Sequence, residues 1–321
     1  MAELLIGMTI IGILAAIILP SLNANLNERL WSTQRKALYT RLSQAFTQMP
    51  AISGYGDYNA TNGVDNVAEA FITKGLATNL KMNHICAVQY GASDEEVKAA
   101  LKQCGISDRY QKQSGGNANF PLKYGTAIRR SIWINPINTN VAAFTTVNGE
   151  SVAVYYNPSC PNKDIYIAPN SQGTISKDFI CAAFVYDLNG LTGPNRMGKD
   201  MGVIGAIGPT DPELIYIDPV ERATATETFD KVGALCRNID KSAHVPTVTE
   251  AYAMLRLGQL YGYPIDRCCG WTRTLQEEDK QYAYYVSQGF GQEVDQSNVW
   301  GTTTRSSKMY TLCNRSLFRQ K

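Results

Sequence analysis

The stretch AELLIGMTIIGILAAIILPSL, residues 2–22, decides how this chain is interpreted. It holds one charged residue, Glu3, ahead of an apolar run from Leu4 to Leu19. At about 1.5 Å per residue, a helical run of this length is close to the roughly 20 residues that span a bilayer. The basic start and the small-residue cleavage site of a secretory signal peptide are missing. We therefore predict a retained helix that can sit in a membrane.

The same helix is predicted to continue as an amphipathic helix up to Pro50. Pro20 should bend it, because proline removes one backbone hydrogen bond. Gly7 and Gly12 permit close approach between neighbouring helices. The apolar positions that recur at helical spacing beyond the bend are Leu22, Leu26, Leu30, Leu38, Leu42, Phe46 and Met49.

A short basic run lies off this apolar stripe. It comprises Arg35, Lys36 and Arg41. We expect these side chains to form the solvated face of the helix rather than a nucleic-acid patch, since the net charge of the chain is only +2.

Residues 2–22 resemble the N-terminal helix of the type IV pilins and of the related pseudopilins of type II secretion. The resemblance is carried by the acidic Glu3, by the run Ile10–Ala16 and by the later Pro20. In that family the acidic residue is the fifth of the mature, N-methylated chain. The resemblance therefore implies that two residues are missing before Met1, or that the match is imperfect at its start.

What the resemblance implies for Glu3 is a pairing with the positively charged N-terminus of a neighbouring subunit, with Gly12 and Pro20 as further assembly positions. An unpaired carboxylate in an apolar helix bundle would cost several kcal/mol or stay protonated, so a partner is physically required. The alternative is that Glu3 lies at the level of the lipid headgroups and meets water.

Composition bounds the remainder of the chain. With 321 residues, 44% hydrophobic and 18% charged, it can form one large or two modest domains. Two histidines leave little room for His-based catalysis or a His-rich metal site, and no G-x-S-x-G nucleophile motif occurs. We expect a protein that is not an enzyme and does not bind nucleic acid.

Eight cysteines follow the apolar helix, and their even number predicts up to four disulfides in an oxidising compartment. Metal binding is disfavoured because no C-x-x-C occurs and neither histidine has a zinc-like spacing from a cysteine pair. Proximity in the sequence predicts the pairs Cys86 with Cys104 and Cys160 with Cys181. The remaining four would staple the last third of the chain: Cys236, Cys268, Cys269 and Cys313.

The middle of the chain reads as an antiparallel sheet. VAAFTTV and SVAVYY flank Asn148-Gly149, which predicts a β-hairpin with a type I′ turn. Further strands are expected at Ser131–Asn135, Asp164–Ala168, Phe179–Tyr186 and Leu214–Ile217, and in the segments YAYYV and MYTLC. Helices are expected at Val67–Lys81, Asp94–Gln103 and Thr247–Tyr261, the last with a capping box of Thr247 and Glu250.

These elements predict an α+β fold. A long N-terminal helix, apolar in its first half and amphipathic in its second, would pack on an antiparallel sheet in a large disulfide-stapled globular domain. Residues 1–50 would form the pilin-like helix, which is membrane-embedded before assembly and the filament core afterwards. Residues 51–240 would form the α+β domain, and residues 241–321 a disulfide-linked subdomain.

One loop has candidate metal ligands. Asp187, Asn189, Asn195 and Asp200 offer the hard oxygens that Ca²⁺ takes from loops, although the full EF-hand pattern is absent. The alternative is a tight turn without metal, because Asp and Asn mimic turn hydrogen bonds and Gly190 supplies a positive φ. Calcium is therefore the one cofactor for which the sequence offers ligands.

As a function we predict a structural subunit of a type IV pilus-like extracellular filament, held in the inner membrane before assembly. Its partners would be further copies of itself, as a helical homopolymer, with prepilin peptidase and the pilus assembly machinery implied by the resemblance. A secretion pseudopilin or a minor tip pilin is the first alternative. A membrane-tethered periplasmic binding or enzymatic module is the second.

Overall fold

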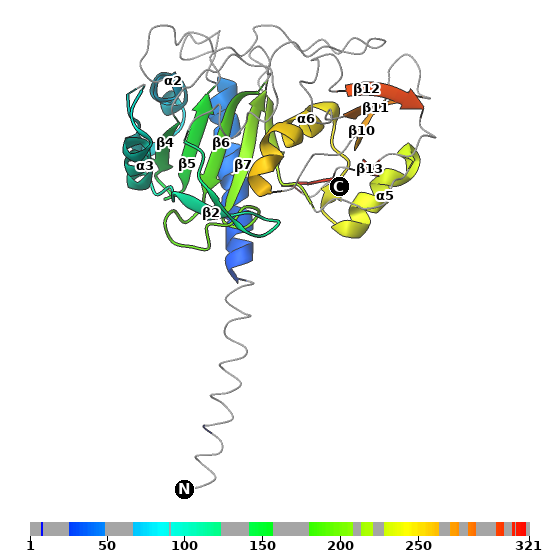
Figure 1. The fold of residues 1–321 in the computed structure, drawn as a ribbon, viewed down its shortest axis with the longest axis horizontal. Helices are drawn as coiled ribbons and strands as arrows, with labels where there is room; N and C mark the ends of the chain where they lie inside the picture. Colours follow the sequence, from blue (N-terminus) through cyan, green and yellow to red (C-terminus); the bar gives the residue numbers. More distant parts are fainter. Residues whose placement is uncertain are drawn as a thin grey trace.

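The computed structural model describes much of the chain from residue 26 onward, together with Met8. The described residues are 8, 26–48, 67–89, 91–122, 141–156, 180–207, 213–220, 228–262, 270–275, 282–286, 300–304, 310–311 and 313–318. The fold is α+β: an N-terminal helix over residues 26–48, a six-stranded antiparallel sheet and a smaller C-terminal group of elements (Figure 1). The predicted fold class is confirmed at this level.

The remaining helical elements are short. They are α2 (Val67–Ala70), the π-helix η1 (Phe71–Gly75), the 3₁₀-helix η2 (Leu76–Thr78), α3 (Asp94–Gln103), α5 (Phe229–Ile239), α6 (Val248–Leu257) and the 3₁₀-helix η3 (Gly258–Tyr261).

The strands of the main sheet are β1 (Met82–Cys86), β4 (Ala142–Thr146), β5 (Ser151–Tyr156), β6 (Ile180–Asp187), β7 (Met201–Ile207) and β8 (Glu213–Ile217). The others are β2 (Arg109–Gln111), β3 (Asn117–Asn119), β9 (Ala243–His244), β10 (Gly270–Leu275), β11 (Tyr282–Val286), β12 (Trp300–Thr304), β13 (Tyr310–Thr311) and β14 (Asn314–Arg315). The main sheet has the order β1-β4-β5-β6-β7-β8, with every neighbour antiparallel.

The N-terminal helix packs on one face of this sheet, as its apolar stripe predicts. Leu38, Leu42 and Phe46 are fully or almost fully buried in one core cluster with Phe144 of β4 and Phe184 of β6. Phe46 contacts Phe184 edge-on, with ring centroids 6.3 Å apart. Burying side chains of this size contributes roughly 1.5–3 kcal/mol each, so the second half of the helix is held firmly to the sheet.

The opposite face of the sheet is covered as well. A second core cluster joins Ala153 and Val185 of the sheet to Leu101 of α3 and to Met254 and Leu257 of α6. Every residue of β5 is therefore buried, whichever face its side chain points to. Strands covered on both faces lose the polar alternation that marks a half-exposed strand.

Two strands of the main sheet, β1 and β7, were not predicted from the sequence, and the glycines of β7 are one cause of its weak signal. Gly202 lies opposite Tyr186 of β6, and a Cβ atom there would overlap the Tyr186 ring and hydroxyl. Glycine in a strand interior marks such a close approach. Gly202, one of the glycines that weaken the strand signal, is thus required by the aromatic side chain of the neighbouring strand.

The predicted hairpin is confirmed, but its turn type is wrong. Strands β4 and β5 pair around Asn148-Gly149, and Gly149 has φ +90°. Asn148 does not have a positive φ, so the turn is not type I′. Gly149 N donates to Thr146 O at 3.0 Å and Thr146 N donates to Glu150 O at 2.9 Å. This is a wider turn with a glycine bulge, which is the next most common hairpin connection.

The two predicted helices that begin after a capping residue are confirmed. Helix α3 spans the predicted residues, and Ser93 and Glu96 form its capping box. Helix α6 begins with the predicted box of Thr247 and Glu250. Each box satisfies two backbone N–H groups that would otherwise lack partners.

The prediction of a solvated basic face on the N-terminal helix is wrong for two of its three residues. Arg41 Nη2 lies 2.5 Å from Glu150 Oε1, whose side chain is 2% exposed in the β4–β5 hairpin. Arg35 reaches β8 and has an 11% exposed side chain. Acidic partners distant in sequence draw both arginines toward the sheet, which a helical pattern alone does not reveal.

The C-terminal group contains a four-stranded sheet of order β12-β11-β10-β13 and the two-stranded pair of β14 and β9. Its small core joins Val220 and Val232 to the disulfide between Cys236 and Cys313. This core contains residues from before and after residue 240. The predicted boundary between the α+β domain and the C-terminal subdomain at that residue stays a prediction. Closing a loop of 77 residues stabilises a fold by about 4 kcal/mol in the chain-entropy account.

Several sequence predictions lie outside the described residues. They concern the strands at Ser131–Asn135 and Asp164–Ala168, and the apolar half of the N-terminal helix with Gly7, Gly12 and Pro20. Within the part of the chain that the structure describes, no helix combines the length and the hydrophobicity needed to cross a bilayer.

Candidate functional site

The loop from Asp187 to Asp200 joins β6 to β7 and holds the four predicted metal-ligand residues. Both of its terminal aspartates are fully buried. Leu188 N donates to Asp200 O at 2.9 Å, so a backbone hydrogen bond closes the loop at its base. The sheet register, which pairs Asp187 with Met201, places the two ends side by side.

The aspartates organise the loop backbone. Asp187 Oδ1 accepts a hydrogen bond from Asn189 N at 3.1 Å. Asp200 accepts two, from Asn195 N and Arg196 N, each at 2.8 Å. These are local turn hydrogen bonds of the kind that Asp makes with the residues near it.

Three buried oxygens in this loop lack a hydrogen-bond partner among the described residues. They are Asp187 Oδ2, Asn189 Oδ1 and Asn195 Oδ1. Buried polar atoms are nearly always satisfied, so an orphaned group calls for an explanation, and an ion is one. All three belong to residues that the sequence singled out as oxygen ligands.

Burial, with a smaller contribution from the nearby Asp200, raises the pKa of the Asp187 carboxyl to about 8, although backbone hydrogen bonds from Asn189 and Gly190 oppose the rise. A cation would reverse this balance, since an adjacent positive charge favours the ionised form.

The donor set fits a hard cation such as Ca²⁺, which takes carboxylate and amide oxygens from flexible loops. The simpler alternative of a bare turn is supported too, because Gly190 has φ +62° and Asn195 has φ +48°. That alternative accounts for the hydrogen bonds of Asp187 Oδ1 and Asp200. It does not account for the three unpartnered oxygens.

A second cluster of metal-binding residue types is a disulfide. His84, Cys86 and Cys104 place their ligand atoms within 4.8 Å of one another. The two sulfurs are joined, with S–S 2.15 Å and Cα–Cα 6.0 Å, so neither is a free thiolate. The predicted pairing of Cys86 with Cys104 is confirmed, and a zinc site is excluded here because thiolates are the ligands that zinc needs.

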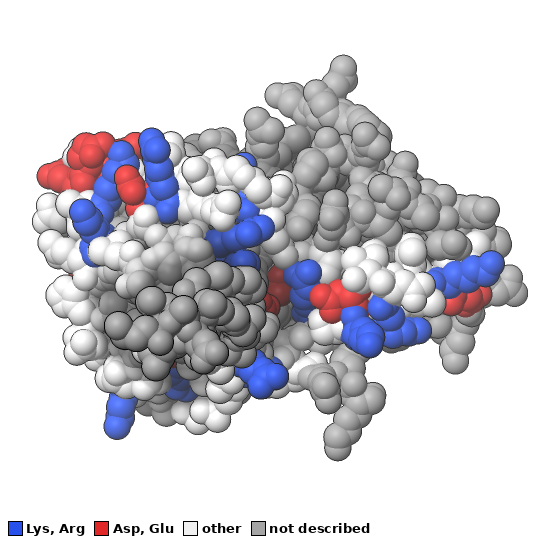
Figure 2. Space-filling view, turned by 90° about the horizontal axis from the view of Figure 1, so that it is seen from below, with Lys and Arg blue, Asp and Glu red and all other residues white. Residues whose placement is uncertain are grey.

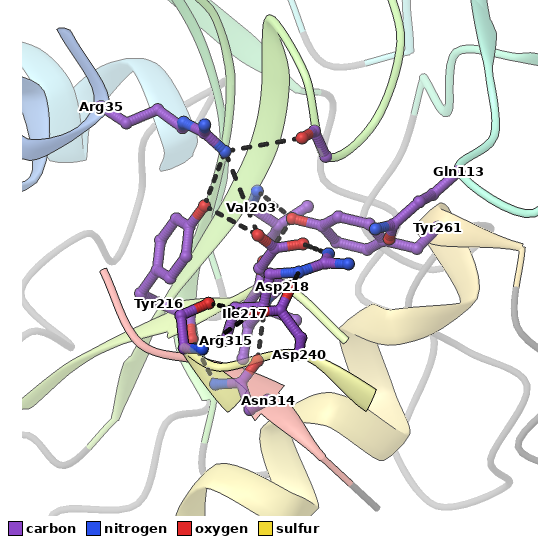
Figure 3. Close-up of polar contacts among 12 residues, drawn as sticks. Arg35, Gln113, Val203, Tyr216, Ile217, Asp218, Asp240, Tyr261, Asn314 and Arg315 are labelled. Carbon is purple, nitrogen blue, oxygen red and sulfur yellow. Dashed lines mark hydrogen bonds and ion pairs between the residues drawn. The ribbon is translucent and has the colours of Figure 1, made fainter. Parts of the chain in front are cut away.

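A buried polar network lies where the N-terminal helix, β8 and β14 meet (Figure 3). At its centre is Asp218, with a side chain 5% exposed. Arg315 Nη1 lies 3.1 Å from Asp218 Oδ1, and its Nε lies 2.7 Å from Asp240 Oδ2. Arg35 approaches Asp218 to 4.0 Å and donates to Tyr216 Oη at 3.3 Å.

Asn314 in the C-terminal segment forms hydrogen bonds with the backbone polar groups around Asp218. Asn314 accepts a hydrogen bond from Asp218 N and donates one to Tyr216 O, both at 2.8 Å. Burial raises the pKa of the Asp218 carboxyl, and the charges of Arg315 and Arg35 oppose that rise. The pKa of Asp240 is lowered to about 2, because hydrogen bonds from Arg315 and Ser242 outweigh its partial burial.

The structure brings together some of the predicted site residues and does not describe others. The four loop residues and two of the cysteine pairs are placed as described above. The others lie outside the described residues: Glu3, Gly12, Pro20, Cys160, Cys268, Cys269 and the side chain of Cys181. The Arg35–Asp218–Arg315 network was not predicted, because its members are scattered from the first helix to the last strand.

Comparison with known proteins adds no relative: no family model, no curated protein and no solved structure matches this chain. Functional conclusions therefore rest on its residues and their geometry.

Proposed function

We propose that this protein is a structural subunit of a type IV pilus-like extracellular filament, in which N-terminal helices pack side by side and the α+β domains form the outer surface. The observation that carries the proposal is the division of the N-terminal helix. Leu38 and Leu42 are buried on the sheet, whereas Leu26 and Leu30, earlier on the same apolar stripe, are 61% and 54% exposed.

These exposed leucines extend the apolar sequence pattern of residues 2–22 beyond Pro20. Large apolar side chains left uncovered along one helix favour burial against neighbouring helices. Head-to-tail contacts that do not close generate a helical fibre. The subunit would reside in the inner membrane before assembly and on the cell surface afterwards, processed by a prepilin peptidase and assembled by pilus machinery.

Two alternatives use the same helix differently. A secretion pseudopilin or a minor tip pilin would form a short assembly or cap a long one. A membrane-tethered binding or enzymatic module would use the helix only as an anchor, and it would leave Leu26 and Leu30 without a protein partner. The exposure of these leucines therefore favours the filament proposal over the anchor alternative.

Microscopy of sheared surface material tests this proposal. We expect electron microscopy to show fibres whose subunit mass matches this chain, and we expect Leu30→Glu to reduce their number strongly, because a charge would be buried between helices. Val147→Glu is the matched control, since Val147 is similarly exposed, at 59%, but lies on the β4–β5 turn. Dispersed monomers in membranes, with no fibres, would favour the anchor alternative.

We also propose that the loop from Asp187 to Asp200 binds calcium in the assembled subunit. Asp187 Oδ2, Asn189 Oδ1 and Asn195 Oδ1 would supply ligands, with Asp200 organising the backbone between them. A bound ion would fix the loop rigidly on the sheet, which suits an exposed connection in an extracellular fibre where calcium is plentiful.

Calcium should therefore stabilise the wild-type chain and not the Asp187→Asn variant. At a hundredfold excess over its Kd, one bound ion adds about 2.7 kcal/mol, which corresponds to roughly 5 °C or more in thermal midpoint. Asp94→Asn, at an exposed position on α3, is the control and should keep the full calcium response. Equal midpoints with calcium and with chelator in the wild type would contradict the proposal.

A further inference from the structure

A cleft of about 980 Å³ lies between the first turns of the N-terminal helix, the end of the Asp187–Asp200 loop, and the elements α5, β9 and β14. In the view from below, Lys and Arg side chains lie on both sides of a few acidic ones in the middle of this face (Figure 2). The cleft is far more basic than the chain as a whole.

Its lining contains eight Lys or Arg residues and three Asp or Glu residues, which leaves five net positive charges. Because the whole chain carries +2, the remainder of the molecule carries a net charge of −3. The low net charge of the sequence therefore conceals a strong separation of charge, and a cleft lined by one sign of charge focuses the field on an anion.

The cations of the cleft fall into two sets. Arg35 and Arg315 form its floor and are paired with Asp218 and Asp240. The cations around the rim have no acidic partner within 4.0 Å in the described parts of the chain; they are Arg29, Lys36, Arg196, Lys199, Arg237 and Lys241. Unpaired like charges around one hollow repel each other, so an anion that bridges them is strongly favoured.

The donor types point to phosphate. Three of the rim cations are arginines, whose planar guanidinium forks match phosphate oxygens in a bidentate manner. The guanidinium of Arg196 is already anchored, because its Nη2 donates to Gln113 O at 3.3 Å. A partly pre-positioned arginine loses less entropy when it binds an anion.

The aromatic content argues against nucleic acid as the ligand, because single strands bind on aromatic side chains that stack with successive bases. The aromatic residues in the described lining are Tyr216 and Phe318. Tyr216 is buried and bonded to Arg35 and Asp218, and Phe318 packs edge-on against Tyr39. Tyr216 is therefore no stacking platform, and Phe318, which is 50% exposed, cannot by itself stack with successive bases.

We propose that this cleft binds a phosphate-bearing anion, either the phosphorylated headgroup of an anionic lipid or a free phosphorylated small molecule. The lipid source rests on the proposed function, under which Arg29 and Lys36 follow the membrane-embedded segment on the same helix and approach the membrane surface. The free phosphate compound requires only the cleft itself.

Titration calorimetry on the full chain in neutral detergent micelles tests the proposal, with pyrophosphate as the first probe. We expect saturable binding that weakens as salt rises, and a loss of roughly tenfold or more in affinity for each charge reversal, Arg196→Glu or Arg237→Glu. Lys102→Glu is the matched control, because Lys102 is an exposed residue of α3 outside the cleft. Unchanged unfolding midpoints would show that the variants remain folded.

Two further probes separate the sources of phosphate. Dihexanoyl-phosphatidylglycerol should bind and dihexanoyl-phosphatidylcholine should not if the cleft takes an anionic headgroup, whereas binding of pyrophosphate alone assigns it to a free phosphate compound. The proposal is overturned if none of these anions binds, if the charge reversals weaken binding no more than Lys102→Glu does, or if only polyglutamate or an oligonucleotide binds. None of these readings depends on whether filaments form.

Discussion

Replacement of Glu3 by alanine is expected to abolish filaments, or to slow their formation greatly, while the α+β domain remains folded. In the proposed assembly, Glu3 compensates the charged N-terminus of the neighbouring subunit inside an apolar helix bundle. Without the carboxylate, that charge would be buried unpaired, at a cost of several kcal/mol per subunit contact. Because every added subunit repeats the contact, the loss acts at each step of growth.

Electron microscopy of sheared fibres, together with immunoblotting of the membrane-held subunit, measures the effect. Glu28→Ala is the matched control, since Glu28 is the next acidic residue along the helix and is exposed. We expect it to assemble as the wild type does. Normal fibres from the Glu3→Ala chain would show that Glu3 is not an assembly residue, and a reduced amount of subunit in the membrane would point to misfolding instead.

Replacement of Arg315 by alanine is expected to destabilise the fold by roughly 3–5 kcal/mol, the usual cost of leaving one partner of a buried ion pair alone. Asp218 would retain Arg35, at 4.0 Å, as its cationic partner, together with the hydrogen bond from Tyr216 Oη, and Asp240 would lose the ion pair with Arg315. Denaturant unfolding followed by tyrosine fluorescence measures the change. Arg273→Ala should cost less than about 1 kcal/mol, because the 3.6 Å pair that it breaks involves a side chain 47% exposed.

The defect of Arg315→Ala should shrink as the pH falls. The folded-state pKa of Asp218 is already raised by burial and rises further without Arg315, so protonation in acid removes the uncompensated charge. The wild type also loses its Asp240 contribution as the pH falls from about 4 toward the folded-state pKa of about 2. Both effects reduce the difference between the free energies of unfolding of the wild type and the variant at low pH. A defect that is constant from pH 8 to pH 4, or unrelieved by Asp218→Asn, would contradict this account.

Local signals in the sequence were sufficient for much of the fold. The capping residue Thr247 marks the start of α6, and the Asn148-Gly149 pair marks the β4–β5 hairpin, because in each case the deciding hydrogen bonds join residues that are near in sequence. The apolar stripe of the N-terminal helix identifies Leu38, Leu42 and Phe46 as buried, because helical periodicity alone places them on one face.

Long-range partners decide the features that could not be predicted. Strand β7 carries Gly202 because Tyr186 of the neighbouring strand needs the space. Arg35 looks solvated in a helical pattern and is instead drawn to Asp218, 183 positions later in the sequence. The basic cleft could not be predicted for the same reason, since its charges come from the first helix, a loop and the C-terminal group. The net charge of the whole chain does not reveal it, because acidic residues elsewhere offset these charges.

The candidate calcium loop lies between these cases. Its ligand residues are close in sequence, so Asp187, Asn189, Asn195 and Asp200 can be picked out from composition and spacing. What the sequence does not reveal is which of their oxygens the backbone uses. That division depends on the path of the folded loop: each Asp200 carboxylate oxygen accepts a backbone N–H, and three other oxygens have no partner.

The dependence of Asp218 on Asn314 and Arg315 also sets an order of events during synthesis. Its partners lie 96 and 97 positions later in the chain. At 5–20 residues per second, the ribosome adds them roughly 5 to 20 seconds after Asp218 itself. During that interval Asp218 has only Arg35 and Tyr216 as partners, and the β8 edge of the sheet lacks the bridge between Pro219 and Asn314. A chain whose synthesis stops in this interval would contain most of the sheet with an exposed strand edge that can pair with other chains. Such a product is a natural target for quality-control proteases.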